Sequence, residues 1–429
     1  MRFMHVADVH LGYQQYGSKE RFNDFSKAFL HVVDQAVERQ VDFVLLAGDL
    51  FEKRTVDPLA MRVAIEGLRR LRDAGVPVVA VEGNHERAYY RDRYSWVDFL
   101  DGLGYLHLLN PRFEDGRAVL EPYGDAGGAY VDLSPAATSD QGARVRVYGI
   151  KYYGASTGEV FGLFADAVAK MDHARVDACI LLSHAGLEGQ LPHYSGTLAH
   201  NDLAPLREHV DYLALGHIHK PCAVDGWIYN PGSPETCSMQ EVAWPERGYY
   251  LVEIQPGGDP THRAELVVTP RRPFRRLRLE VDALTEPNAV YDAVRRLIRR
   301  EDGNVPRDPA PVVELTLGGV LPFNRFELDL DYVKRLLEDA WAPLVTRVRN
   351  STTPAAFEVA MDVEASRPQL ERSIVRELLQ RDTRFRPAAE EWTRVALDVK
   401  RLVLDGSPPE AVIDVLRRAR AELMAEQTL

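Results

Sequence analysis

The first 250 residues alternate short apolar runs with amphipathic helical stretches, and this alternation limits the possible folds more than any other feature. Residues 21–40 and 58–75 carry apolar side chains at the helical period, and the second stretch lies between Asp57-Pro58 and Gly75. Strand-like runs lie around them at residues 3–7, 43–47, 76–81, 144–150, 178–183, 212–216 and 249–254. Strands and helices in alternation predict a layered α/β domain.

A change in composition near residues 255–273, which contain QPGGDP and TPRRP, marks a domain boundary. Beyond it, strand-like and helical patterns alternate again and predict a small second α/β domain, and from about residue 355 the chain is mainly helical. A chain of 429 residues is expected to form two or three domains. We expect three parts, at residues 1–268, 269–352 and 353–429.

The overall composition is that of a globular protein, with 45% hydrophobic and 27% charged residues. The sequence contains no run of about 18 apolar residues, so we expect no membrane span. The start MRFMHVADVHLG has no leader pattern, so we expect no signal peptide. Three cysteines without metal-type spacing are typical of a reducing compartment. We therefore expect a cytoplasmic protein, associated with the nucleoid if it acts on DNA.

Polar side chains follow five of the predicted strands. The stretch VVAVEGNHER, residues 78–87, shows the pattern: an apolar run stops at Gly83 and delivers an amide beside an imidazole. Ligands of open α/β sheets collect outside the carboxyl ends of strands, and the residues found there are Asp8, His10, Asp49, Asn84, His85, His184, His217 and His219.

The spacing within these groups suits metal binding. In an extended segment, residues i and i+2 point the same way, so Asp8 with His10, and His217 with His219, can each offer two side chains to one site. Carboxylates, imidazoles and one amide oxygen suit Mn²⁺, Fe²⁺ or Zn²⁺ better than Mg²⁺. Each group alone is common in ordinary turns, but the ordered set of five favours a metal site.

The order DxH, GD, GNH[DE], H and GHxH resembles the calcineurin-like metallophosphoesterase superfamily over about the first 250 residues. The resemblance implies a layered β-sandwich flanked by helices, with two metal ions. The first ion would be held by Asp8, His10, Asp49 and His219, and the second by Asp49, Asn84, His184 and His217. His85 would not be a ligand; it would act on the scissile phosphate or protonate the leaving oxygen.

Three longer segments are similar to the SbcD-type DNA repair exonucleases of that superfamily: MRFMHVADVHLG, GDLFEKRTVDPLAM and NPGSPETCSMQEVAWPERGYYLVEI. The resemblance implies a homodimeric DNA exonuclease and endonuclease of double-strand-break repair, with two Mn²⁺ per chain, although Mg²⁺, Fe²⁺ or Zn²⁺ remain alternatives. Its DNA would be duplex ends, single strands or hairpins, and an SbcC-like coiled-coil ABC ATPase its partner. Residues 269–352 would form an α/β capping domain that contacts DNA. Glu86 departs from the aspartate common in this group.

An arginine cluster lies within a protein whose net charge is −12. Residues 271–300 hold nine arginines against four acids, which favours phosphate contacts if the protein binds DNA, whereas a solvated helix face is the alternative. A second group follows His85 in a segment rich in tyrosine. The candidate DNA-binding residues are Arg87, Arg91, Arg93, Arg271, Arg272, Arg275 and Arg276.

Two points stay open on the sequence alone. The apolar stripe of PPEAVIDVLRRARAELM can pack against the chain itself or bind the ATPase partner. The function can also be that of a metallophosphoesterase acting on nucleotides, small phosphodiesters or phosphoproteins, or of a DNA-end scaffold without activity. The complete set of seven ligand candidates together with His85 argues against the scaffold.

Overall fold

The computed structural model describes residues 1–88, 94–125, 127–134, 144–191, 195–255, 261–354, 366–381 and 385–423. Two six-stranded sheets form the core of the N-terminal part. The first has the order β16-β15-β1-β2-β3-β4, with β1 (Arg2–Val6), β2 (Phe43–Leu46), β3 (Val78–Ala80), β4 (His107–Leu108), β15 (Gly248–Ile254) and β16 (His262–Val268). Its strands β1 to β4 are parallel, and β15 and β16 are antiparallel to their neighbours.

The second sheet has the order β13-β14-β12-β9-β8-β7, and its strands are β7 (Tyr130–Leu133), β8 (Val145–Ile150), β9 (Ala178–Ser183), β12 (Tyr212–Leu215), β13 (Cys222–Val224) and β14 (Ile228–Asn230). Strands β8, β9, β12 and β14 run parallel, while β7 and β13 are antiparallel edge strands. Parallel central strands bring their carboxyl ends to one edge of each sheet, where the candidate ligands lie.

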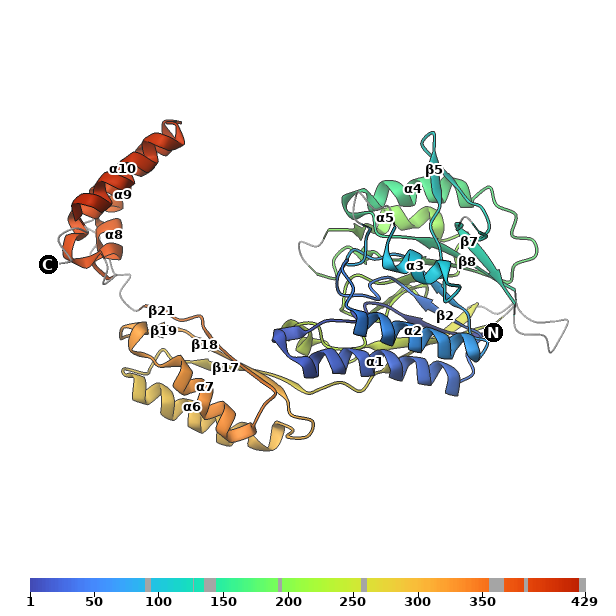
Figure 1. Cartoon of the computed structure of the whole chain (residues 1–429), viewed down its shortest axis with the longest axis horizontal. Coiled ribbons are helices and arrows are strands. Elements are labelled where there is room, and N and C mark those ends of the chain that lie inside the picture. The colour runs from blue at the N-terminus through green and yellow to red at the C-terminus, as the bar shows by residue number, and fades with distance from the viewer. Residues whose placement is uncertain are drawn as a thin grey trace. The chain divides into compact units, whose positions relative to one another are not determined.

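Helices cover the outer faces of both sheets, so that four layers stack (Figure 1). One apolar core joins the first sheet to α1 (Lys19–Glu38), α2 (Pro58–Asp73) and α3 (Trp96–Gly102). A second core, which includes Phe3, Leu45 and Ile180, fills the space between the sheets. A third lies between the second sheet and helices α4 (Thr157–Val168) and α5 (His200–Leu203). Both faces of the central strands are buried, which explains their continuous apolar runs.

The starts of the first three helices follow from local sequence. Ser18 caps α1 by accepting from Arg21 N, and Asp57 caps α2, whose first residue is a proline. Ser95 and Asp98 form a reciprocal capping box at α3. These caps satisfy backbone N–H groups that a helix leaves without partners.

Beyond residue 273 lies a three-stranded sheet of order β17-β18-β20, with β17 (Phe274–Glu280), β18 (Val312–Gly318), β20 (Val345–Asn350), and the helices α6 (Pro287–Glu301) and α7 (Leu330–Trp341). The C-terminal helices are α8 (Arg367–Arg381), α9 (Ala389–Leu404) and α10 (Pro409–Leu423). Three small two-stranded pairs complete the fold: β5 (Arg112–Glu114) with β6 (Arg117–Val119), β10 (Gly186–Leu187) with β11 (Thr197–Leu198), and β19 (Val320–Leu321) with β21 (Thr353–Pro354).

The contacts divide the chain into two compact units, residues 1–278 with 295–316 and 331–349, and residues 279–294 with 317–330 and 350–429. The predicted layered α/β fold, the smaller α/β region and the helical C-terminal region are confirmed. The expected boundary segment contributes a further strand, because β16 pairs along the whole of β15. No described helix is long and apolar enough to span a membrane.

Candidate metal centre

The eight predicted site residues lie at adjoining strand ends of the two sheets. Asp8 and His10 follow β1, Asp49 follows β2, and Asn84 and His85 follow β3, which are neighbours in the first sheet. His184 follows β9, and His217 and His219 follow β12, its neighbour in the second sheet. The structure therefore brings together side chains that are separated by more than 200 residues, as the strand-end pattern predicts.

Four of these residues adopt left-handed backbone conformations that side chains other than glycine rarely enter. The φ angles are 54° at Asp8, 53° at His10, 53° at Asp49 and 76° at His217. Such residues cluster at functional sites because the surrounding structure must hold them in place. Here the backbone ladder continues past the strands, with His10 N donating to Asp49 O at 3.0 Å.

Three imidazoles are oriented so that a lone pair points into the centre. The outer nitrogen of each donates to an acceptor: His184 Nδ1 to Ala47 O at 2.7 Å, His217 Nε2 to Ser195 O at 2.8 Å, and His219 Nδ1 to Glu241 Oε1 at 2.9 Å. A neutral imidazole carries one N–H, so the inner nitrogen of each ring is an acceptor. This is the arrangement in which proteins present histidine to a metal.

These inner nitrogens face other acceptors. Asn84 Oδ1 lies 2.9 Å from both His184 Nε2 and His217 Nδ1, and Asp49 Oδ2 lies 3.3 Å from His184 Nε2. When the rings are neutral, oxygen and nitrogen lone pairs repel one another at such distances unless a positive charge, a proton or a metal ion, lies between them. The donor set around Asn84 therefore fits a divalent cation.

A second group of donors surrounds His10 on the other side of Asp49. His10 Nε2 lies 3.1 Å from His219 Nε2 and 4.0 Å from Asp49 Oδ2, and His219 Nε2 lies 3.7 Å from Asp8 Oδ1. Ligand atoms of Asp8, His10 and Asp49 all lie within 4.8 Å of one another. His10 is buried and its Nδ1 makes no hydrogen bond, although Glu52 Oε2 is 2.9 Å away. This donor group fits a second cation, and Asp49 lies between the two donor groups.

The pKa values show how strongly the centre attracts positive charge. Burial lowers the pKa of His184, but the Asp49 and Asp8 carboxylates and the hydrogen bonds to Asp49 and Ala47 together raise it to about 9, so a proton occupies this ring when no cation is bound. Burial raises the pKa of Asp49, but the charges of His184, His10 and His85 hold it below its usual range. Burial lowers the pKa of His217 to about 4, which keeps that ring neutral, as a metal ligand must be.

Glycines are required at two points of close approach in the site. A Cβ at Gly83 would lie 2.5 Å from Asp49 N and 2.7 Å from Asp49 Cγ, on the neighbouring loop of the same sheet. A Cβ at Gly48, whose φ is +79°, would lie 2.6 Å from Cγ of His184, which follows a strand of the other sheet. Both glycines precede predicted ligands, and neither position has room for a side chain.

His85 differs from the ligand histidines in its orientation. Its Nδ1 donates to Glu52 O at 2.8 Å, and its backbone N–H donates to Asp49 Oδ1 at 2.9 Å. Nε2 makes no hydrogen bond to any residue that the structure describes, and 37% of the side chain is exposed. His85 thus stands at the edge of the donor set with one ring nitrogen available to a substrate.

Glu86 stabilises the loop that presents Asn84 and His85. Its carboxylate accepts from Phe51 N at 3.1 Å and Gly83 N at 3.2 Å, which ties the β2 loop to the β3 loop. Burial raises the pKa of Glu86 to about 8. The glutamate at this position therefore supports the centre from behind and does not enter it.

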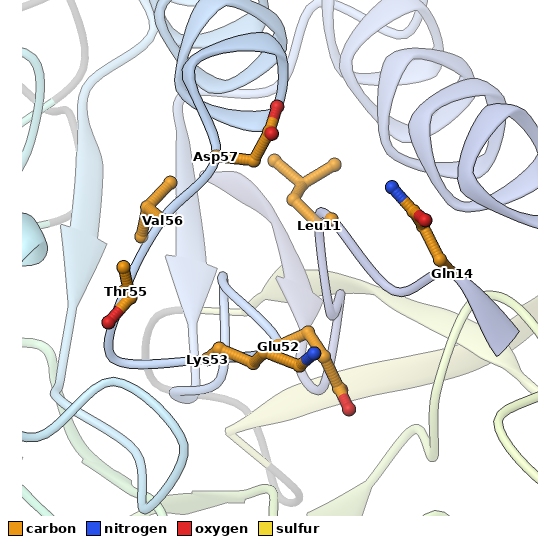
Figure 2. Close-up of a pocket in the computed structure, with 8 residues that line it drawn as sticks. Leu11, Gln14, Glu52, Lys53, Thr55, Val56 and Asp57 are labelled. Atoms are coloured by element: carbon orange, nitrogen blue, oxygen red, sulfur yellow. The ribbon is translucent and has the colours of Figure 1, made fainter. Parts of the chain in front are cut away.

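Two depressions flank the loop that follows Glu52. The first, of about 240 Å³, is drawn in Figure 2 and is lined by Leu11, Gly12, Gln14, Glu52, Lys53, Thr55, Val56 and Asp57. The second, of about 330 Å³, is lined by Arg54, Thr55, Glu86, Arg87, Ala88, Tyr94, Ser95, Trp96 and Phe99. The second depression begins directly after His85 and combines arginines with exposed aromatic rings.

The structure separates the candidate DNA-binding arginines into groups. Arg271 donates to Arg247 O, and Arg272 pairs with Asp24 at 2.6 Å, so both are engaged within the chain. Arg275 and Arg276 are exposed on β17, and Arg87 is exposed beside the second depression. Arg91 and Arg93 lie outside the described residues.

Three residues that the motifs do not contain also contribute to the centre. Glu52 contacts His10 and orients His85 through its carbonyl, and Glu241 orients His219. Cys237 also lies here, because its sulfur is within 4.8 Å of ligand nitrogens of His10 and His219. A thiol therefore lies within reach of the predicted ligand set. Of these three residues, only Glu52 could have been suspected from the sequence, because it follows the predicted ligand Asp49 by three residues.

Comparison with known proteins agrees with this geometry. A family model described as Calcineurin-like phosphoesterase matches residues 1–221. The "DNA double-strand break repair protein Mre11" of Aeropyrum pernix is 30% identical over 311 residues, which cover 71% of this chain and 69% of that protein. The protein of the same name from Haloferax volcanii is 32% identical over 317 residues, which cover 73% of this chain and 61% of that protein.

Proposed function

Because the chain belongs to the calcineurin-like phosphoesterase family, in its group of Mre11-like and SbcD-like proteins, we propose that it hydrolyses phosphodiester bonds of DNA in the repair of double-strand breaks. The observation that carries the proposal is the set of inward lone pairs on His184, His217 and His219, which converge with Asp8, Asp49 and Asn84. We propose that both exonuclease and endonuclease cleavage occur at this one centre.

Two ions, which we propose to be Mn²⁺, fit the two donor groups. Asp8, His10, Asp49 and His219 would hold the first, and Asp49, Asn84, His184 and His217 the second. Two ions bound about 3.5–4 Å apart lower the pKa of water and stabilise the attacking and leaving oxygens of a phosphoryl transfer. Imidazole with carboxylate suits Mn²⁺, and the neutral Asn84 oxygen limits the negative charge of the second position.

His85 is the residue that moves a proton. The Glu52 carbonyl fixes the Nδ1 proton, so Nε2 is the atom that faces the substrate. An imidazole can hold a proton at this atom and release it to the departing oxygen. The hydrogen bond from His85 N to Asp49 Oδ1 fixes the distance between this proton and the ligand set.

The surroundings of His85 favour DNA over a small phosphodiester. Arg54 and Arg87 with Tyr94 and Trp96 line the second depression, and arginines mixed with aromatic rings bind single-stranded nucleic acid through phosphate contacts and base stacking. Exposed arginines on β17 add a surface for sequence-independent phosphate contacts. We propose Arg87, Arg275 and Arg276 as DNA contacts, and extend the proposal to Arg91 and Arg93 on the sequence alone.

The partners that we propose are a second copy of the chain and a coiled-coil ABC ATPase of the SbcC type. The C-terminal helices supply a surface for the ATPase, because apolar side chains on α8, α9 and α10 remain exposed: Ile374, Leu378, Val403, Leu404, Ile413 and Leu416. Ala419 is buried, so the stripe predicted on α10 is used partly within the chain and partly left open.

The test compares wild type with His85→Ala on linear duplex DNA, single-stranded DNA and a small aryl phosphodiester, with Mn²⁺ present. We expect the wild type to cleave DNA and His85→Ala to lose 10²-fold or more of that activity, with both proteins binding the same amount of Mn²⁺. His200→Ala, an exposed histidine outside the centre, is the matched control and should cleave normally. Hydrolysis of the small diester without any DNA cleavage, even with the ATPase added, would establish the alternative phosphoesterase function.

A further inference from the structure

Cys237 lies beside the donor group formed by Asp8, His10, Asp49 and His219. It lies in the turn that follows β14, with its sulfur within 4.8 Å of ligand nitrogens of both His10 and His219. The other two thiols of the chain, Cys179 on β9 and Cys222 on β13, belong to no such group among the described residues.

One carboxylate positions both His219 and Cys237. Glu241 Oε1 accepts from His219 Nδ1 at 2.9 Å, and Glu241 Oε2 accepts from Cys237 N at 2.9 Å. Arg247 pairs with the same carboxylate and holds it in place. Gln15 Nε2 donates to Cys237 O at 2.7 Å from the opposite side. The same carboxylate therefore fixes the position of the His219 imidazole relative to Cys237.

The sulfur lies beside the histidines and is weakly held elsewhere. In the part of the chain that the structure describes, the thiol donates one long hydrogen bond to a carbonyl, 3.6 Å to Glu235 O. A bound divalent ion deprotonates a thiol that coordinates it. His10 turns its Nε2 to the same corner, 3.1 Å from His219 Nε2, so two imidazole nitrogens already converge beside the sulfur.

We propose that Cys237 is a sulfur donor to the ion held by Asp8, His10, Asp49 and His219, an inference that rests on the metal centre proposed above. On binding, the S–H bond breaks, the sulfur lone pair bonds to the ion and the proton passes to solvent. A thiolate ligand favours softer ions. The thiolate therefore makes the first position more selective for Zn²⁺ or Co²⁺ over Mn²⁺ than the second position, which has an amide oxygen and no sulfur.

The test is a titration of the full-length, metal-free protein with Co²⁺ alone, followed by absorption. A thiolate bound to Co²⁺ adds a charge-transfer band in the near ultraviolet to the visible bands of the ion. We expect this band in the wild type and in Cys222→Ser, whose half-buried thiol belongs to no donor group among the described residues, and its loss in Cys237→Ser. We also expect Cys237→Ser to lose on the order of tenfold in Zn²⁺ affinity with little change for Mn²⁺.

The outcomes separate this inference from the proposed function. Visible Co²⁺ bands without the near-ultraviolet band in the wild type, or a band that persists in Cys237→Ser, would overturn the thiolate and leave the metal centre standing. No Co²⁺ bands in any of the three proteins would overturn both. Unfolding of metal-free Cys237→Ser and wild type should coincide, which shows that a lost band does not come from a lost fold.

Discussion

Replacing Gly83 by alanine should disable the metal centre without touching a ligand. The added Cβ would lie 2.5 Å from Asp49 N and 2.7 Å from Asp49 Cγ, whereas ordinary contact begins at 3.4 Å. Asp49 must therefore retreat by roughly 1 Å, or the β3 loop must do so. Because Asp49 belongs to both donor groups, both ions would be misplaced, and a misplacement of about 1 Å can lower a rate about 10²-fold.

The assay measures DNA cleavage with Mn²⁺, the amount of bound metal and urea unfolding, for wild type, Gly83→Ala and Gly162→Ala. Gly162 is the matched control, since it lies in α4 with nothing within 4 Å of an added Cβ. We expect Gly162→Ala to cleave normally and to gain up to about 1 kcal/mol in unfolding free energy. Gly83→Ala should lose about two orders of magnitude in cleavage and bind metal more weakly.

A result in which Gly83→Ala keeps full metal content and cleaves within threefold of the wild type would refute this reasoning. The loop would then accommodate the methyl group without moving Asp49, and the tight packing of the loops after β2 and β3 at the site would not be required. Equal loss of activity in Gly162→Ala would equally show that the effect is not specific to the centre.

The remaining predictions concern pH, the support of the centre and the C-terminal helices. Burial lowers the pKa of His5 to about 3, so as the pH falls the unfolded chain binds a proton at this ring that the folded chain does not bind. The free energy of unfolding is therefore highest above pH 6.5 and should fall by about 2 kcal/mol by pH 5. Urea unfolding of His5→Gln should not show this loss. Glu241→Gln leaves Arg247 buried without its charge partner, so we expect a loss of about 3 kcal/mol in unfolding free energy and 10- to 100-fold weaker metal binding by equilibrium dialysis. Leu404→Ser, at a side chain that is 74% exposed, should change stability by less than about 0.5 kcal/mol but abolish co-elution with the ATPase; normal co-elution would show that α9 is not the docking surface.

The sequence predicts the central strands, and it predicts which polar side chains the structure gathers at their ends, because both depend on short-range patterns. Buried parallel strands are continuous apolar runs, and the polar residue that ends each run is visible without knowing the partners of the strand. For this reason β9 is predicted at its observed bounds, Ala178–Ser183, and α2 within two residues at its end. The two-residue strands such as β4 carry no such pattern, and tertiary pairing alone defines them.

The supporting residues of the centre could not be predicted, because their roles depend on contacts between distant segments. Glu241 and Cys237 reach His219 only because a turn after β14 folds back over the end of β12. Arg272 and Arg275 belong to the same basic cluster in the sequence, yet Arg272 pairs with Asp24, 248 residues away. Net charge in a window identifies a basic cluster, but only the fold decides which arginines are already occupied.

The geometry of the centre also explains why its ligands occupy unfavourable backbone conformations. Asp8, His10, Asp49 and His217 are all left-handed, and a left-handed conformation costs about 1–2 kcal/mol for a residue with a side chain. The apolar cores on both faces of the strands and the continued backbone ladder hold these residues in place before any ion binds. The free energy of folding therefore offsets the cost of these backbone conformations, and ion binding requires little further rearrangement of the ligands. A centre prepared in this way would bind the proposed ions through complementary charge and tolerate little movement of Asp49, the residue proposed for both donor groups.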